Sequence, residues 1–107
     1  MSILHIVAWF GAGGLLINTL PHLIAGLQGR AFQSPFAKPP GVGLSSPLSN
    51  VLWGFFNLVA SWALFTQVGA FDLANAAHAG VAAFGGLFSG VFLAVHFGKL
   101  HGSGKGY

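Results

Sequence analysis

Long uncharged stretches dominate the pattern of hydrophobic and polar positions along this chain. Residues 1–29, 39–71 and 73–98 contain no Asp, Glu, Lys or Arg, and each stretch holds a predominantly apolar run. A helix needs about 20 such residues to cross a hydrocarbon layer of roughly 30 Å. We therefore predict an all-α integral membrane protein with three transmembrane helices, over residues 3–27, 48–71 and 73–100.

Turn-forming residues separate the predicted helices. The connection over residues 28–47 contains repeated Pro and Gly, which argue against a continuous helix there. Ser46 followed by Pro47 is typical of an N-cap with proline at the first helical position. Asp72 stands where it would cap the third helix. Residues 101–107 are expected to form a flexible tail, and the whole chain to form one membrane domain.

Composition agrees with this interpretation. Only 5% of the 107 residues are charged and 54% are hydrophobic, whereas soluble domains carry about 25% charged residues. The chain has no cysteine, which excludes disulfides and thiolate metal sites formed by its own residues. With no Glu and a single Asp, it also lacks the paired carboxylates of general acid–base catalysis. We predict no catalytic residue and no enzyme activity, except as an electron-transfer subunit of a membrane oxidoreductase.

The four cationic residues indicate how the helices are oriented. Arg30 and Lys38 lie in the first connection, and Lys99 and Lys105 follow the third helix. Three spans place all four on one side, which the positive-inside rule assigns to the cytoplasm. The N-terminus would then lie outside and the C-terminus in the cytoplasm. The cations form no basic stripe, so we do not expect a nucleic-acid partner.

Small residues recur every four positions on one face of each predicted helix. Such faces let helix backbones approach closely in lipid. We expect them to pack against each other within the chain or between copies. The expected packing residues are Gly14, Gly54, Gly86 and Gly90.

Polar side chains occur within or beside these faces. An amide or imidazole facing hydrocarbon is costly unless it finds a partner. Asn18, His22, Asn57 and His78 therefore point to one of two arrangements. They form hydrogen bonds between helices, or they line a polar intramembrane site for a small molecule, an ion or a lipid headgroup.

The histidines allow a further alternative. Helices 1 and 3 run parallel, so His5 would lie near His78, and His22 near His96. This is the outline of two bis-histidine b-haem sites. The other interpretation is that these are interfacial histidines bonded to headgroups, water or backbone. No histidine pair has i, i+4 spacing, so we predict no dedicated metal site.

The segment over residues 28–57 combines turn-forming, aromatic and cationic residues. Phe32 and Phe36 can enter the membrane interface, Arg30 and Lys38 can reach anionic headgroups, and Trp53 fits an interfacial aromatic belt. We expect either a connector lying on the membrane surface or a surface that docks a partner protein.

The run SPFAKPPGVGLSSPLSNVLWG within this segment resembles a run in a family of small uncharacterised bacterial inner-membrane proteins. The resemblance covers about thirty residues, 28–57. It implies a bacterial inner-membrane location, and it brings no activity, cofactor or substrate.

Three short spans with little mass outside the membrane favour a small accessory or structural subunit. It would pack within a larger or self-assembled membrane complex, in contact with other subunits and lipids, and with bound lipid as its only expected non-protein component. The alternative is a small homo-oligomeric transporter or channel with a polar intramembrane site. A further alternative is a b-haem or quinone electron-transfer subunit.

Overall fold

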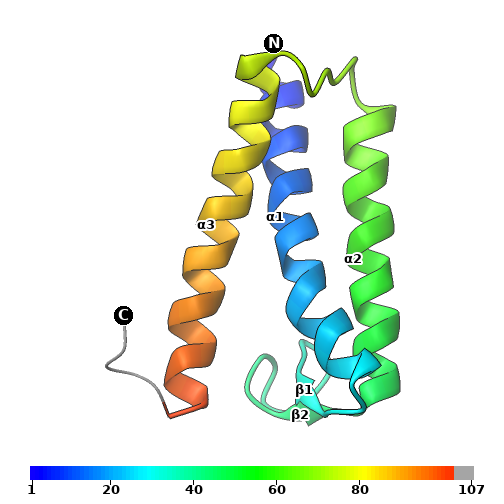
Figure 1. Ribbon diagram of the computed structural model, residues 1–107, viewed down its shortest axis with the longest axis vertical. Coiled ribbons are helices and arrows are strands. Elements are labelled where there is room, and N and C mark those ends of the chain that lie inside the picture. The colour runs from blue at the N-terminus through cyan, green and yellow to red at the C-terminus, as the bar shows by residue number, and fades with distance from the viewer. Residues whose placement is uncertain (103–107) are drawn as a thin grey trace.

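The computed structural model describes residues 1–102 and contains three long helices (Figure 1). Helix α1 spans Ile3–Leu27, α2 spans Pro47–Gln67 and α3 spans Ala76–Leu100. Two strands of two residues each, β1 (Phe32–Gln33) and β2 (Leu44–Ser45), pair antiparallel in the connection between α1 and α2. His101, the first residue of the expected tail, is the C-cap of α3, and residues 103–107 lie outside the described part.

Side-chain caps start all three helices. The Ser2 hydroxyl accepts from the His5 N–H, and the Ser46 hydroxyl accepts from the Ser49 N–H. Pro47 follows Ser46 at the start of α2, as the sequence predicts. These bonds satisfy N–H groups that have no carbonyl partner in the first turn of a helix.

The structure corrects the expected boundary between the second and third helices, where the sequence predicts a tight turn at residues 71–73. α2 ends at Gln67 and α3 begins at Ala76, so a linker of residues 68–75 replaces a tight turn. Asn75, and not Asp72, caps α3, because its side chain accepts from the first-turn N–H groups. The Asp72 carboxylate instead accepts from the N–H of Ala74 within the linker. The linker contains aromatic and apolar residues that continue the hydrophobic pattern of the helices, so the sequence predicts longer helices than the structure has.

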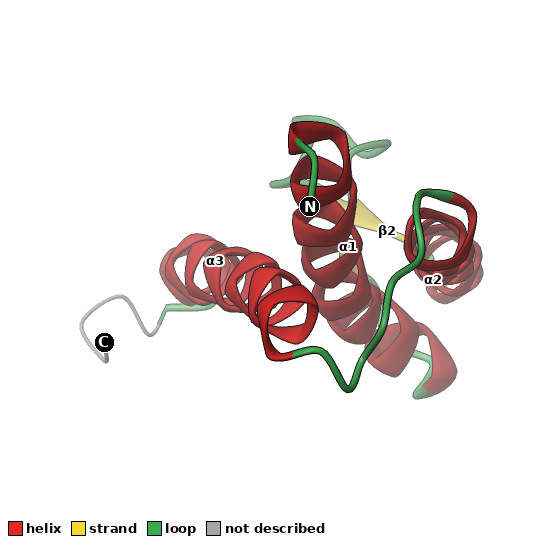
Figure 2. Ribbon diagram, turned by 90° about the horizontal axis from the view of Figure 1, so that it is seen from above, coloured by secondary structure: helices red, strands yellow, loops and turns green. Residues whose placement is uncertain are grey.

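α1 lies between the other two helices. Viewed from above, α2 and α3 lie on opposite sides of it (Figure 2). α1 packs closely against both, whereas α2 and α3 barely contact each other. The N-terminus and the 68–75 linker share one end of the molecule, here called the linker end (Figure 1). The loop of residues 28–46 and the C-terminal end of α3 share the other, here called the loop end (Figure 1).

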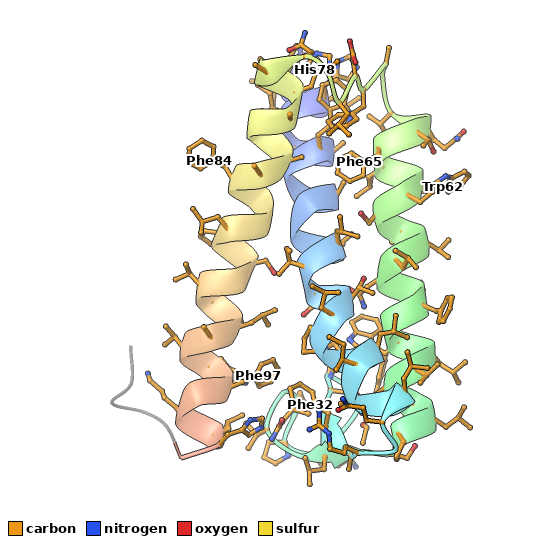
Figure 3. All side chains as sticks on the ribbon, viewed as in Figure 1. Phe32, Trp62, Phe65, His78, Phe84 and Phe97 are labelled. Carbon is orange, nitrogen blue, oxygen red and sulfur yellow. The ribbon has the colours of Figure 1, made fainter. Side chains whose placement is uncertain are left out.

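All three helices are long and apolar enough to span a membrane, at 25, 21 and 25 residues. Most of their large apolar side chains lie on the outside of the bundle. Trp62 on α2 and Phe84 on α3 point away from the other helices (Figure 3). A water-soluble protein would bury such residues, so the chain has the character of a multi-pass membrane protein.

Candidate functional site

Polar side chains join α1 to α2 along the length of the two helices. Near the middle, Asn18 Nδ2 donates to Asn57 Oδ1 at 3.0 Å. Toward the linker end, the Ser61 hydroxyl donates to the Ala12 carbonyl at 2.7 Å. Asn57 is 0% exposed and Ser61 is 2% exposed. These bonds pair the polar groups with each other in the interior of the molecule.

The third polar contact lies toward the loop end. His22 Nδ1 donates to Asn50 Oδ1 at 2.8 Å. The Nδ2 group of Asn50 lies 3.1–3.2 Å from the carbonyl oxygens of Phe32, Ser45 and Ser46. The fully buried side chain of Asn50 therefore forms hydrogen bonds with α1, with the residue that precedes α2 and with both strands of the loop. Asn50 lies on the buried face of α2 with Gly54 and Asn57, but its contact with the loop depends on the loop's fold.

The four residues expected to form a polar site lie at two places. Asn18, His22 and Asn57 share the α1–α2 interface, where each has a hydrogen-bond partner in the protein. His78 lies at the linker end, far from the loop (Figure 3). Its Nδ1 accepts from the backbone N–H of Asp72 at 3.0 Å.

Aromatic rings gather at the linker end around Trp9. The His5 ring stacks on Trp9 with centroids 5.1 Å apart, and the His78 ring lies 4.5 Å from the same indole. Trp9 Nε1 donates to the Val68 carbonyl at 2.9 Å, which attaches the 68–75 linker to α1. His5 and His78 are therefore both in contact with the Trp9 indole.

The remaining histidines attach α3 to the loop. His96 Nε2 donates to the Gly41 carbonyl at 2.7 Å, and His101 Nε2 donates to Gln33 Oε1 at 2.9 Å. His22 and His96 therefore have different partners. Within residues 1–102, no cluster of three or more His, Asp, Glu or Cys side chains could hold a metal ion.

The residues expected in the interfacial loop have separate roles. Phe32 packs edge-on against His22 on α1 and against Phe97 on α3, with centroids 5.6 and 4.7 Å apart. Figure 3 shows Phe97 pointing toward Phe32. Phe36 instead packs perpendicular to Trp53 at 5.1 Å and remains 68% exposed. Arg30 donates to the Gln28 side chain, and Lys38 is exposed.

The expected packing glycines lie at helix contacts. A Cβ added to Gly54 would lie 3.1 Å from Leu23 of α1, and one added to Gly86 would lie 3.1 Å from Ile17 of α1. At Gly90 the added Cβ would be 3.9 Å from Ile17, an ordinary van der Waals distance. α3 is therefore tightly packed at Gly86 and looser at Gly90.

The closest approach of α1 and α3 involves glycines that sequence reasoning missed. A Cβ at Gly13 would overlap the Ala82 carbonyl, and a Cβ at Gly85 would overlap the Phe10 carbonyl. Gly14, the expected packing residue, has more room, with its added Cβ 3.5 Å from the Gly85 carbonyl. Each missed glycine is adjacent to an expected one. Which of two neighbouring glycines faces the other helix depends on the rotation of each helix about its own axis.

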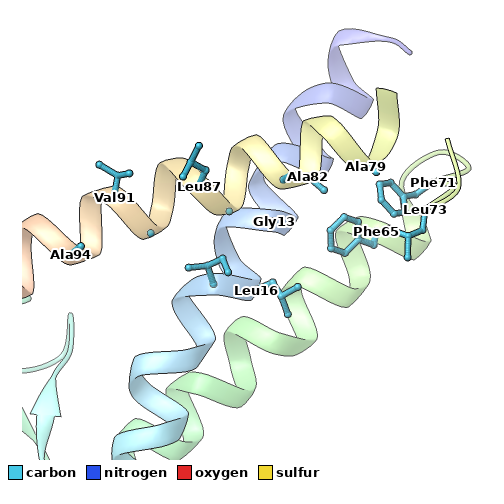
Figure 4. Close-up of a pocket in the computed structure, with 14 residues that line it drawn as sticks. Gly13, Leu16, Phe65, Phe71, Leu73, Ala79, Ala82, Leu87, Val91 and Ala94 are labelled. Atoms are coloured by element: carbon cyan, nitrogen blue, oxygen red, sulfur yellow. The ribbon is translucent and has the colours of Figure 1, made fainter. Parts of the chain in front are cut away.

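A groove of about 900 Å³ lies along α3 on the side that faces α2, with α1 as its floor (Figure 4). We call it the α2–α3 groove. From α2, the lining contains Phe65 alone. Its α3 wall carries small residues every four positions, and the Leu and Phe side chains of the other elements complete an apolar lining. Phe65, Phe71 and Leu73 gather at one end of the groove (Figure 4). The lining includes Leu16, Phe65, Ala82, Gly86, Gly90 and Ala94.

No protein-family model matches this chain, and neither does any curated protein or solved structure. The function therefore has to be inferred from the contacts of the chain itself. Its buried polar groups join helices to each other and to the loop, and the α2–α3 groove offers an apolar surface.

Proposed function

We propose that this protein is a small membrane subunit whose α2–α3 groove accepts a transmembrane helix of another polypeptide. The single observation that carries the proposal is the unfilled groove along α3, on the side that faces α2, a helix that α3 barely contacts. Self-assembly and assembly with a larger protein are both forms of this function. A bacterial inner membrane, with the loop end in the cytoplasm, is the location that we propose for it.

The dimensions of the groove support a helix as its occupant. Its α3 wall extends from Ala79 to Ala94, which is about 22 Å along a helix axis. This length covers most of a hydrocarbon layer of roughly 30 Å. α3 is also the least buried of the three helices, and Gly85 is its only buried residue. α1 contacts this wall at Ala82 and Gly86. A second helix in the groove would cover the exposed residues of the wall, Ala83, Leu87, Val91 and Ala94.

The chemistry of the groove supports the same occupant. Helices in lipid associate largely through van der Waals packing, and small residues let their backbones approach. Ala82, Gly86, Gly90 and Ala94 provide such a surface on one wall.

The transport alternative depends on Asn18, His22 and Asn57, each of which has a hydrogen-bond partner within the protein. The electron-transfer alternative depends on histidines that lie at both ends of the bundle and have separate partners. Both alternatives remain predictions from the sequence alone.

Photocrosslinking in the native membrane tests this proposal. A photoreactive amino acid at Ala83, which lines the groove, is expected to give an adduct with a defined polypeptide. The same amino acid at Trp62, which points away from the bundle, serves as the control (Figure 3). The mass of the adduct distinguishes a second copy from another subunit. A position 83 that crosslinks only lipid, or no more polypeptide than position 62, would overturn the proposal.

A matched pair of glycine variants strengthens the experiment. Gly90→Leu fills the groove where the contact with Ile17 is loose, so the fold is expected to survive. It should abolish the position-83 adduct. Gly80→Leu places the same side chain on the same helix at a position with no atom within 4 Å. That variant should keep the adduct, and loss of the adduct in both variants would contradict a groove-specific contact.

A further inference from the structure

A second recess lies on the outside of α2 at the loop end. It has a volume of about 550 Å³ and is lined by Phe36, Ser49, Leu52, Trp53 and Phe56. We call it the Phe36 groove. Phe36 packs perpendicular to Trp53 at 5.1 Å, and Trp53 stacks on Phe56 at 5.5 Å. Phe36, Leu52 and Phe56 are each more than 60% exposed, so the groove opens to the outside of the bundle.

The groove changes from polar to apolar in the direction of the membrane interior. Ser49 belongs to the first turn of α2, where the helix dipole is positive. Its hydroxyl accepts from the Ser46 hydroxyl at 3.0 Å, so its own hydrogen can be donated elsewhere. Leu52 and Phe56 lie one and two turns further into the span. This order matches a phospholipid, which has its phosphate at the surface and its acyl chains below.

Charge at the loop end favours an anionic headgroup. Lys38 follows Phe36 by two residues and is exposed, and Arg30 belongs to the same loop. The only acidic residue of the chain, Asp72, lies in the linker at the opposite end. A cation near the membrane surface attracts anionic lipid. Among residues 1–102, no Asp or Glu side chain lies at this end.

Among the residues that line the Phe36 groove, one buried polar atom has no hydrogen-bond partner within residues 1–102. The indole Nε1 of Trp53 is buried and, among the described side chains, has no hydrogen-bond acceptor in the protein. Trp53 lies six residues into α2, about 9 Å from the start of the helix. The glycerol ester carbonyls of a phospholipid are hydrogen-bond acceptors at this interfacial level. A hydrogen bond from the indole to one of them would remove the cost of a buried unpaired donor.

We propose that the Phe36 groove binds one anionic phospholipid. Its phosphate lies near Lys38 and the start of α2, and its ester group accepts from Trp53. One acyl chain runs along Leu52 and Phe56. The Phe36 groove has no lining residue in common with the α2–α3 groove, so this proposal and the proposed function succeed or fail separately.

Native mass spectrometry of the full chain tests the proposal, with phosphatidylglycerol and phosphatidylcholine as competing probes. The wild type should retain phosphatidylglycerol preferentially. Lys38→Gln should lower this preference about fivefold, which is the effect of one lysine at a membrane surface. Lys99→Gln removes the same charge from α3, at an exposed position outside the groove, and should leave the preference unchanged.

A second pair of variants tests the indole N–H. Trp53→Phe keeps an aromatic ring and removes the donor, so it should weaken retention of both lipids. Trp62→Phe changes an exposed tryptophan outside the groove and should have no effect. Equal retention of the two lipids by the wild type would overturn the proposal. Equal losses in Lys38→Gln and Lys99→Gln would also overturn it, as would a polypeptide adduct from a photoreactive group at Leu52.

Discussion

At the scale of single residues, Asn50 has the largest structural role among the polar side chains. Its amide reaches the carbonyl oxygens of Phe32, Ser45 and Ser46 while its oxygen accepts from His22. No water reaches this fully buried side chain. A buried carbonyl or N–H without a partner costs about 1–3 kcal/mol. The loop and two helices therefore depend together on one side chain.

Asn50→Leu keeps the number and branching of the side-chain heavy atoms and removes all of these hydrogen bonds. We expect the free energy of unfolding to fall by about 2–4 kcal/mol, because several buried groups lose their partner. Unfolding in mixed micelles, followed by circular dichroism, measures this loss. Gln67→Leu, at an exposed amide near the end of the same helix, should change the stability by less than about 0.5 kcal/mol. If Asn50→Leu has the same free energy of unfolding as the wild type, the side chain lacks this role.

At the scale of elements, two different kinds of contact hold the helices together. α1 and α2 are joined by hydrogen bonds between buried side chains. α1 and α3 instead cross through the paired glycines Gly13 and Gly85, where each backbone meets a carbonyl of the other helix. The histidines His96 and His101 then attach α3 to the loop. α3 is therefore positioned by backbone proximity and by contacts at its ends.

Gly85→Ala tests the crossing of α1 and α3. The added methyl group would overlap the Phe10 carbonyl, so the helices must move apart. Overpacking of this kind costs about 1–3 kcal/mol, and we expect a matching loss of stability in the same micelle assay. Gly80→Ala adds a methyl group in open space on α3 and should be neutral or slightly stabilising, by up to about 1 kcal/mol. Indistinguishable stabilities for the two variants would contradict the close crossing.

At the scale of the whole molecule, charge is distributed unevenly between the two ends. Arg30 and Lys38 lie in the loop and Lys99 lies at the end of α3, whereas Asp72 lies in the linker. The structure places the loop and the end of α3 at the same end of the bundle (Figure 1). By the positive-inside rule, this distribution supports the proposed cytoplasmic location of the loop end.

Labelling of single cysteines tests this orientation, because the chain has no cysteine of its own. Ala31→Cys in the loop and Ala70→Cys in the linker are matched substitutions at exposed positions. In intact bacterial cells, a membrane-impermeant maleimide should label position 70 and not position 31. After the cells are permeabilised, both should react equally. Labelling of position 31 alone in intact cells would reverse the proposed orientation.

The sequence by itself determined the number of helices, most of their boundaries and the caps formed by Ser46 and Pro47. These features are local, since they depend on the length of apolar runs and on residues within one turn of each helix end. The end of α2 and the cap of α3 were missed. There the apolar pattern continues into a linker whose path depends on contacts such as that between Trp9 and Val68.

Only the tertiary structure decided which polar and small residues meet. The sequence placed Asn18, His22 and Asn57 among the helices, but their pairing required the rotation of α1 and α2 about their axes. The same rotation selected Gly13 and Gly85 over their neighbours. The two grooves also depend on how far α3 and the loop lie from α2. A pattern along one helix gives the composition of each face, whereas the position of the other helices decides which face is covered.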